Sequence, residues 1–239
     1  MIIDISAWNG NFNFDKAKAA GVIGVYMRSN FGLSVDSKYG TNRQNCTLDY
    51  SGAYHYFDYR GNGADQCKKF LDTVGSWGNM RGVLDLEDNS ANGWPRLDSM
   101  YGQALKEALS WVNTYKLETG HNPVMYLNSG LCRQKDYLNR YIFRNFLECP
   151  LWVAHYTNYP SPITGAWAEA ALWQYSSTGD GILYGNSTGN KYIDLNRVFN
   201  LQALLKPGIT PEDEVIPVPV VLTDAEKLAK LWQHHSELH

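Results

Sequence analysis

Long apolar runs, a basic charge balance and paired cysteines are all missing from this chain of 239 residues. No stretch of 18 apolar residues occurs, so we expect no membrane span. The 21 Lys and Arg residues are outnumbered by 24 Asp and Glu residues, which gives a formal net charge of −3. Proteins that bind nucleic acid carry a basic surface, and we therefore expect no nucleic-acid partner.

The spacings typical of metal and redox sites are also missing. The four cysteines form no Cys-x-x-Cys pair, and the six histidines form no His-Glu-x-x-His segment. We expect no metal site and no cofactor, with the cysteines as small buried side chains at positions 46, 67, 132 and 149.

A secretory signal is not recognisable at the N-terminus. The chain enters the strand-like segment Ile2–Ile5 directly, without the basic segment, apolar stretch and cleavage site of a signal peptide. We expect synthesis in the cytoplasm and release toward an external target by another route.

Aromatic residues are abundant, at 13% of the chain, with 8 Trp and 16 Tyr. These side chains cover sugar rings with an apolar face while offering a polar atom, and they also fill protein cores. The composition therefore permits sugar binding without proving it.

Short apolar or alternating runs recur along the chain and predict eight strands. Helical spacing predicts helices over Phe14–Ala20, Ala64–Trp77 and Leu97–Leu117 between the earlier runs. Strands that alternate with helices favour parallel pairing, so we expect an irregular β/α barrel whose last third is rich in strands. The eight predicted strands are Ile2–Ser6, Val22–Arg28, Gly52–Phe57, Gly82–Glu87, Pro123–Asn128, Leu151–Tyr156, Ala171–Tyr175 and Lys191–Leu195.

The fourth of these strands carries two acids at alternating positions. Asp85 and Glu87 share one face of the strand, while Leu84 and Leu86 share the face that packs on a core. Two strand rises hold the carboxyl groups roughly 6 to 7 Å apart, a spacing suited to acid-assisted cleavage of a glycosidic bond.

Two further strands repeat this pattern, with Asp4 in the first and Asp194 in the last. In a β/α barrel the chemistry gathers where the strands end. Like charges placed together destabilise a fold unless one is protonated or the site is used, so four acids at one barrel mouth indicate a functional site.

Six segments in a fixed order resemble a known family. They are Asp4-Ile5-Ser6-Ala7-Trp8-Asn9-Gly10, Gly52–Phe57, Asp85-Leu86-Glu87, Leu151–Tyr156, Leu172–Tyr175 and Asp194–Arg197. This order is similar to that of the lysozymes of glycoside hydrolase family 25, the N-acetylmuramidases common among bacteriophage endolysins. The resemblance runs from Asp4 to Leu205 and implies an α/β fold, an irregular TIM-like (β/α)5β3 barrel. One departure is Asn9, where many members carry Gln.

The resemblance also implies roles for individual residues in cleaving the β-1,4 bond between N-acetylmuramic acid and N-acetylglucosamine in peptidoglycan. Glu87 would be the general acid, with its pKa raised by the charge of Asp85 and by burial. Asp85 would stay ionised and either stabilise positive charge on the sugar or orient its acetamido group. Because both carboxyl groups lie on one strand face, we favour retention by substrate assistance, and inversion stays open. Asp4 and Asp194 would hold substrate and tune these two acids.

Binding residues are implied in the same way. Arg28 would end its strand near the acids and either be solvated or, as we favour, pair with them. The floor and walls of the sugar groove would be formed by Tyr54, Tyr56, Trp152, Tyr156, Trp173 and Tyr175.

Two other interpretations stay open. A chitinase-like barrel uses a similar Asp-x-Glu, although Val83 stands where the middle acid of the longer chitinase series would be. A non-catalytic glycan-binding or phage structural module would keep the aromatic residues without needing an acid at Glu87.

The C-terminal part differs in composition from the barrel, which we assign to residues 1–205. Residues 206–221 are rich in proline and predict an extended linker. Residues 222–239 predict a short amphipathic helix, opened by a capping box from Thr223 to Glu226. A helix of this length is marginal alone in water, so its apolar stripe within 222–238 predicts self-association, docking of a partner or packing on the barrel.

Overall fold

The computed structural model describes residues 1–187 and 191–211, and Met1–Ile209 forms one compact unit. Lys206, one residue past the boundary predicted at position 205, donates hydrogen bonds from its ammonium group to the carbonyls of Trp77 and Gly78 within this unit. The predicted helix over 222–239, and most of the predicted linker, lie outside the described residues. Within the described ranges, no helix is both long enough and apolar enough to cross a membrane.

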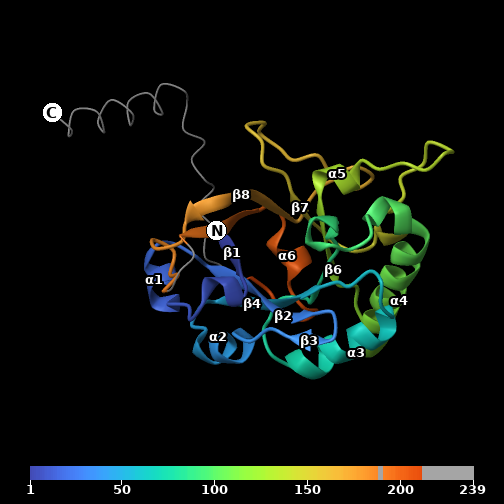
Figure 1. Cartoon of the computed structure of the whole chain (residues 1–239). Helices are drawn as coiled ribbons and strands as arrows, with labels where there is room; N and C mark the ends of the chain where they lie inside the picture. The colour runs from blue at the N-terminus through green and yellow to red at the C-terminus, as the bar shows by residue number, and fades with distance from the viewer. Residues whose placement is uncertain (188–190, 212–239) are drawn as a thin grey trace. The chain divides into compact units, whose positions relative to one another are not determined.

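Eight strands close into a barrel (Figure 1). Neighbouring strands from β1 through β8 pair in parallel, whereas β9 pairs antiparallel with both β8 and β1 and so closes the ring. The two-residue strand β3 pairs only with β2 and lies outside the ring. The strands are β1 (Ile2–Ile5), β2 (Gly24–Phe31), β3 (Ser34–Val35), β4 (Tyr50–Tyr56), β5 (Val83–Asp85), β6 (Val124–Asn128), β7 (Leu151–Ala154), β8 (Leu172–Asp180) and β9 (Tyr192–Val198).

A helix follows each of the first five barrel strands, and among the described residues none lies between β7, β8 and β9. This order confirms the predicted (β/α)5β3 barrel. Figure 1 shows the longer helices around the outside of the strands. The helices are α1 (Phe14–Ala19), α2 (Tyr39–Asn45), α3 (Gly63–Val74), α4 (Tyr101–Thr119), α5 (Ser129–Cys132) and α6 (Leu201–Leu204), with single turns η1 (Ala7–Asn9), η2 (Ser90–Asn92), η3 (Leu97–Met100) and η4 (Arg144–Phe146).

All eight predicted strands are present, with differences at their ends. β5 ends at Asp85, so Glu87 lies just beyond the strand rather than within it. Helix α2 was not predicted because its sequence, Tyr-Gly-Thr-Asn-Arg-Gln-Asn, has no apolar periodicity.

Side chains that alternate along the strands pack into two separate hydrophobic clusters. Ile2 faces the barrel interior and packs in a cluster with Val83 and Trp152, whereas Ile3 belongs to the cluster between strands and helices. Leu201 and Leu204 of α6 join the interior cluster, and Arg81 before β5 donates its backbone N–H to the Leu204 carbonyl. Helix α6 therefore closes the end of the barrel where the parallel strands begin, and leaves the opposite end for the site.

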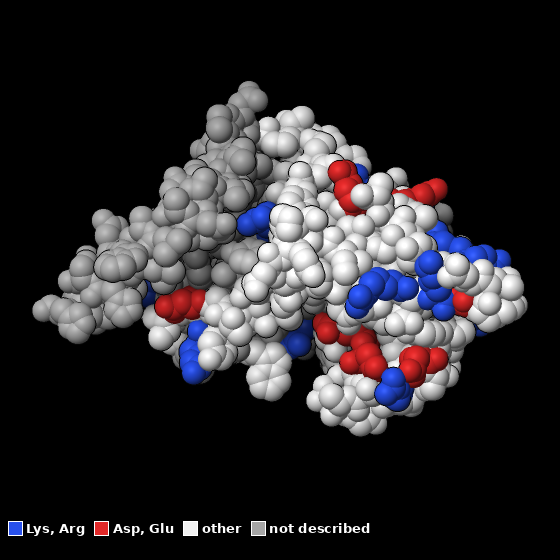
Figure 2. Space-filling view, turned by 90° about the horizontal axis from the view of Figure 1, so that it is seen from above, with Lys and Arg blue, Asp and Glu red and all other residues white. Residues whose placement is uncertain are grey.

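The charged groups on the outside do not segregate by sign on the face in Figure 2. Acidic and basic side chains are interspersed there over a surface that is mostly neither.

Close packing of α3 on α4 depends on a glycine, which gives a testable prediction. A Cβ at Gly63 would lie far inside van der Waals contact with the backbone carbonyl of Glu107. We expect Gly63→Ala to lower the free energy of unfolding by about 1–3 kcal/mol, as overpacking does, measured by chemical denaturation.

Gly40 in α2 is the matched control, because a Cβ there meets nothing within 4 Å. Alanine at this position should stabilise by up to about 1 kcal/mol through helix propensity. Equal effects of the two substitutions would contradict the packing account.

Candidate active site

The carboxyl ends of the parallel barrel strands, together with the first part of β9, surround a cavity of about 300 Å³. All four acids singled out in the sequence line it, although they come from three strands and the segment after β5. The aromatic residues in its wall are Trp8, Tyr54, Tyr56, Tyr126, Trp152 and Tyr156.

Asp85 and Glu87 form the first acid pair. Asp85 is 5% exposed at the end of β5, and Glu87 is half-buried two residues later. Their carboxyl groups are hydrogen-bonded to each other, so the pair must hold a proton. Burial raises the pKa of both groups, and for Asp85 repulsion from Glu87 and Asp4 raises it further.

This pair corrects two details of the sequence interpretation. The side chains converge into contact instead of standing two strand rises apart. Burial and the neighbouring acids raise the pKa of Asp85 well above its usual range, a direction opposite to the ionised state that we expected for it. One of its oxygens, Oδ1, is buried and has no hydrogen-bond partner among the described residues.

Asp4 and Asp194 form the second acid pair. They stand directly opposite each other in the antiparallel pairing of β1 with β9, and their carboxyl groups are hydrogen-bonded. Burial, followed by repulsion from Asp4, raises the pKa of Asp194 to about 9. Burial also raises the pKa of Asp4, against the opposing effect of its amide donors.

Those donors belong to a buried hydrogen-bond network that fixes Asp4. Its Oδ2 accepts from Asn196 Nδ2 at 2.8 Å and from Gln174 Nε2 at 3.1 Å. Gln174 Oε1 accepts in turn from the hydroxyls of Tyr126 and Tyr156, at 3.0 and 2.7 Å. Asn196 Oδ1 accepts from Trp152 Nε1 at 2.7 Å. The network ties β1 to β6, β7, β8 and β9.

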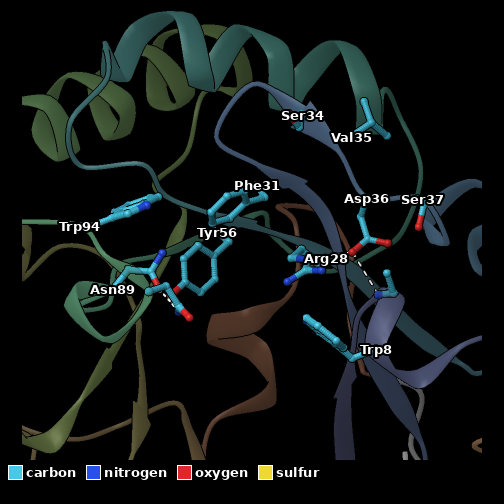
Figure 3. Close-up of a pocket in the computed structure, with 12 residues that line it drawn as sticks. Trp8, Arg28, Phe31, Ser34, Val35, Asp36, Ser37, Tyr56, Asn89 and Trp94 are labelled. Atoms are coloured by element: carbon cyan, nitrogen blue, oxygen red, sulfur yellow. Dashed lines mark hydrogen bonds and ion pairs between the residues drawn. The ribbon is translucent and has the colours of Figure 1, made fainter. Parts of the chain in front are cut away.

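Arg28 lines the cavity, but its ion pair is not with the acid cluster. Its Nε donates to Asp36 Oδ2 at 2.7 Å (Figure 3). The same oxygen accepts from the backbone N–H of Ala7 at 3.0 Å, which fixes the turn η1 that carries Trp8. Burial alone would lower the pKa of Arg28, but the negative charges of Asp36 and, without an ion pair, of Asp85 raise it. The predicted pairing is therefore corrected to Asp36.

Four of the six predicted aromatic residues, Tyr54, Tyr56, Trp152 and Tyr156, line the cavity. Trp173 does not: it is 3% exposed, belongs to the outer core and donates from Nε1 to the His155 carbonyl. Tyr175 packs on it outside the cavity.

The correction follows from strand alternation. Gln174 points inward, so its two neighbours on β8 must point outward. The sequence motif already contained this signal, because Gln174 lies between them.

Other side chains in the site were not predicted. The cavity is lined by Gln174 and Tyr126, and Asn196 supports it by a hydrogen bond to Asp4. Trp8 stands at the rim of the cavity with 77% of its surface exposed. Across residues 1–187 and 191–211, no cluster of three or more His, Cys, Asp or Glu side chains is arranged to hold a metal ion.

Comparison with known proteins places this geometry in a family. The family model described as glycosyl hydrolases family 25 matches residues 3–181. This chain belongs to glycosyl hydrolases family 25. Lysozyme M1 of Streptomyces globisporus is 27% identical over 205 residues, which make up 80% of this chain and 66% of that protein. The chain thus spans just under two thirds of the length of this curated relative.

Two solved structures share the fold. A bacterial lysozyme from Streptomyces coelicolor superposes with a TM-score of 0.69 at 23% identity, covering 84% of this chain and 93% of that one. The CTP1L endolysin superposes with a TM-score of 0.60 at 25% identity, covering 82% of this chain and 65% of that one.

The raised pKa of Asp194 predicts how stability depends on pH. Because the folded pKa of about 9 exceeds the ordinary value of 3.8, the folded state binds more protons, and stability falls as pH rises between these values. Asp194→Asn removes this group, so the stability of the variant should fall less steeply as the pH rises. Near pH 9 the melting temperature of the variant should therefore exceed that of the natural protein.

Thermal unfolding between pH 4 and pH 9 measures this dependence, because a change of 1 kcal/mol in the free energy of unfolding shifts the melting temperature by about 2–4 °C. Asp72→Asn, at an exposed position on α3, is the control and should leave the slope unchanged. Parallel curves for Asp194→Asn and the natural protein would contradict the assignment.

Proposed function

We propose that this chain is a muramidase that hydrolyses the β-1,4 bond between N-acetylmuramic acid and N-acetylglucosamine in peptidoglycan. The observation that carries the proposal is the acid pair of Asp85 and Glu87, which holds a proton inside a cavity walled by aromatic side chains. A binding module has no use for such a pair, because buried like charges cost stability without aiding adhesion. The family and its lysozyme relatives support the same activity.

Glu87 is the general acid in this proposal. It is the less buried member of the pair, just beyond β5, where it can reach the oxygen between two sugars. Positive charge that develops at the sugar C1 stabilises an ionised Asp85, and this shifts the shared proton to Glu87 for donation to the leaving oxygen.

Asp85 assists the substrate rather than attacking it. Retaining enzymes with a protein nucleophile hold their carboxyl groups about 5–5.5 Å apart, and inverting enzymes about 6.5–9.5 Å apart, whereas this pair is in contact. Asp85 lines the cavity, and its ionised carboxylate is suited to orient the acetamido group of the substrate, so that the acetamido oxygen attacks C1. The product would then keep the β-configuration.

Asp4 and Asp194 hold the sugar and keep the local charge low by sharing a proton of their own. Tyr54, Trp152 and Tyr156 supply apolar surface for the rings. The place of action would be the bacterial cell wall, and synthesis in the cytoplasm stays a prediction.

The general-acid role predicts a specific loss. Glu87→Gln keeps the shape of the side chain but removes the proton, so lysis of purified cell walls should fall by about 10²–10⁴-fold. The melting temperature should stay equal or rise, because one crowded carboxyl group is gone. Glu118→Gln, exposed on α4, is the control and should retain activity. Near-normal lysis by Glu87→Gln would refute the role.

The bond and the stereochemistry are tested on products. Mass spectrometry of digested peptidoglycan should find reducing ends of N-acetylmuramic acid, whereas N-acetylglucosamine ends would indicate another glycosidase. Proton NMR of the first product formed should show the β-anomer. An initial α-anomer would mean inversion and exclude substrate assistance.

A further inference from the structure

Arg28 is the one cation that lines the acidic cavity among the described residues, and its counter-ion lies outside that cavity. The counter-ion is Asp36, directly after β3, whose side chain is 1% exposed and does not line the cavity. Figure 3 shows Arg28 between Tyr56 and Asp36. Within residues 1–187 and 191–211, Asp36 is also the only acid in ion-pair contact with Arg28.

The position of Asp36 is fixed by backbone groups from three segments. Its Oδ2, which accepts from Arg28 Nε, also accepts from the N–H of Ala7, and its Oδ1 accepts from the N–H of Lys38 at 2.9 Å. Its own N–H donates to the Ser29 carbonyl at 2.8 Å. The carboxylate is therefore held in place on the side of β2 and β3, and it holds the guanidinium by Nε.

The groups around Arg28 show what its charge would do without this counter-ion. The charged and titratable groups that act on Arg28 are Asp36 after β3, Tyr54 and Tyr56 on β4, and Asp85 on β5. Those that act on the acid pair from the remaining elements are Asp4 on β1, Tyr126 on β6, Tyr156 after β7 and Asp194 on β9. None of this second set is a cation, so Arg28 is the group able to neutralise Asp85.

Neutralisation by Arg28 would work against the chemistry of the pair. A cation beside a carboxyl group favours its ionised form, and an uncompensated guanidinium would therefore draw the proton away from Asp85 and Glu87. With Asp36 in place, the positive charge is offset by a negative one outside the cavity.

We propose that Asp36 is a positioning residue for the acid pair: it holds Arg28 by Nε and so leaves Asp85 and Glu87 to share their proton. The proposal rests on the proposed function, in which that proton passes to the leaving oxygen. Asp36 acts only through Arg28, because it does not line the cavity. The arrangement extends activity to a higher pH than a cavity with an uncompensated cation would allow.

The test is the pH dependence of cell-wall lysis in Asp36→Asn, which keeps the shape of the side chain and removes its charge. Lysis needs a protonated pair, so the rate falls as the pH rises through the pKa of the pair. In the variant this fall should occur about one pH unit lower, because the released cation favours ionised carboxyl groups. At the acidic end of the range the rate should stay within about twofold of the natural protein, whereas a purely structural role would lower it at every pH.

Combining Asp36→Asn with Arg28→Gln removes both charges and should return the fall to its natural position. Replacing both partners of a buried ion pair is better tolerated than removing one, so this double variant tests the proposal even if the single one does not fold. If Arg28 already neutralised the acids in the natural protein, the double variant would instead lose activity at a higher pH.

Asp49→Asn is the matched control. It makes the same chemical change in the exposed ion pair with Lys18, just before β4 begins and so at the end of the barrel away from the acids. Its pH profile should match that of the natural protein.

The remaining outcomes separate this proposal from the proposed function. If Asp36→Asn keeps the natural position of the fall, or loses the same factor at every pH, the role of Asp36 is refuted. A double variant displaced from the natural position refutes it as well. If the natural protein lyses no cell wall at any pH, the proposed function fails, and the proton is followed by the infrared band of protonated carboxyl groups. The part of that band missing in Glu87→Gln should then disappear at a lower pH in Asp36→Asn, and an unchanged titration would overturn the role.

Discussion

The crowding of four carboxyl groups at one buried barrel mouth governs the rest of this site. Such a cluster is tolerable only when protons are shared, and the structure pairs Asp85 with Glu87 and Asp4 with Asp194. Arg28 contributes little neutralisation to the cluster because Asp36 holds it. The folded barrel therefore keeps protons bound to these carboxyl groups, and its stability is lower at high pH.

The amide residues deserve as much weight as the acids in this arrangement. Gln174 and Asn196 each donate to Asp4 and accept from a tyrosine or tryptophan across the barrel. Because every atom of such a buried chain needs its partner, the network holds Asp4 in one orientation. Loss of one amide would therefore disturb groups on several strands.

Much of this could be predicted from sequence, since alternation along a strand is a local property. Asp4, Asp85 and Asp194 were recognised because apolar neighbours marked the opposite face. Alternation also places Trp173 and Tyr175 outside the cavity, because Gln174 lies between them and points inward. We predicted them to line the sugar groove from their aromatic character instead. The Arg28–Asp36 pair was not predictable, because it requires the turn between β2 and β3 to fold the chain back on itself.

The shared oxygen of Asp36 joins two parts of the rim that are distant along the chain. Through it, the hairpin of β2 and β3 is mechanically connected to the turn that carries Trp8. One carboxylate oxygen thus braces two parts of the entrance that lie more than twenty positions apart in the chain, and loss of the Asp36 carboxylate would release the Arg28 guanidinium and the Ala7 amide at the same time.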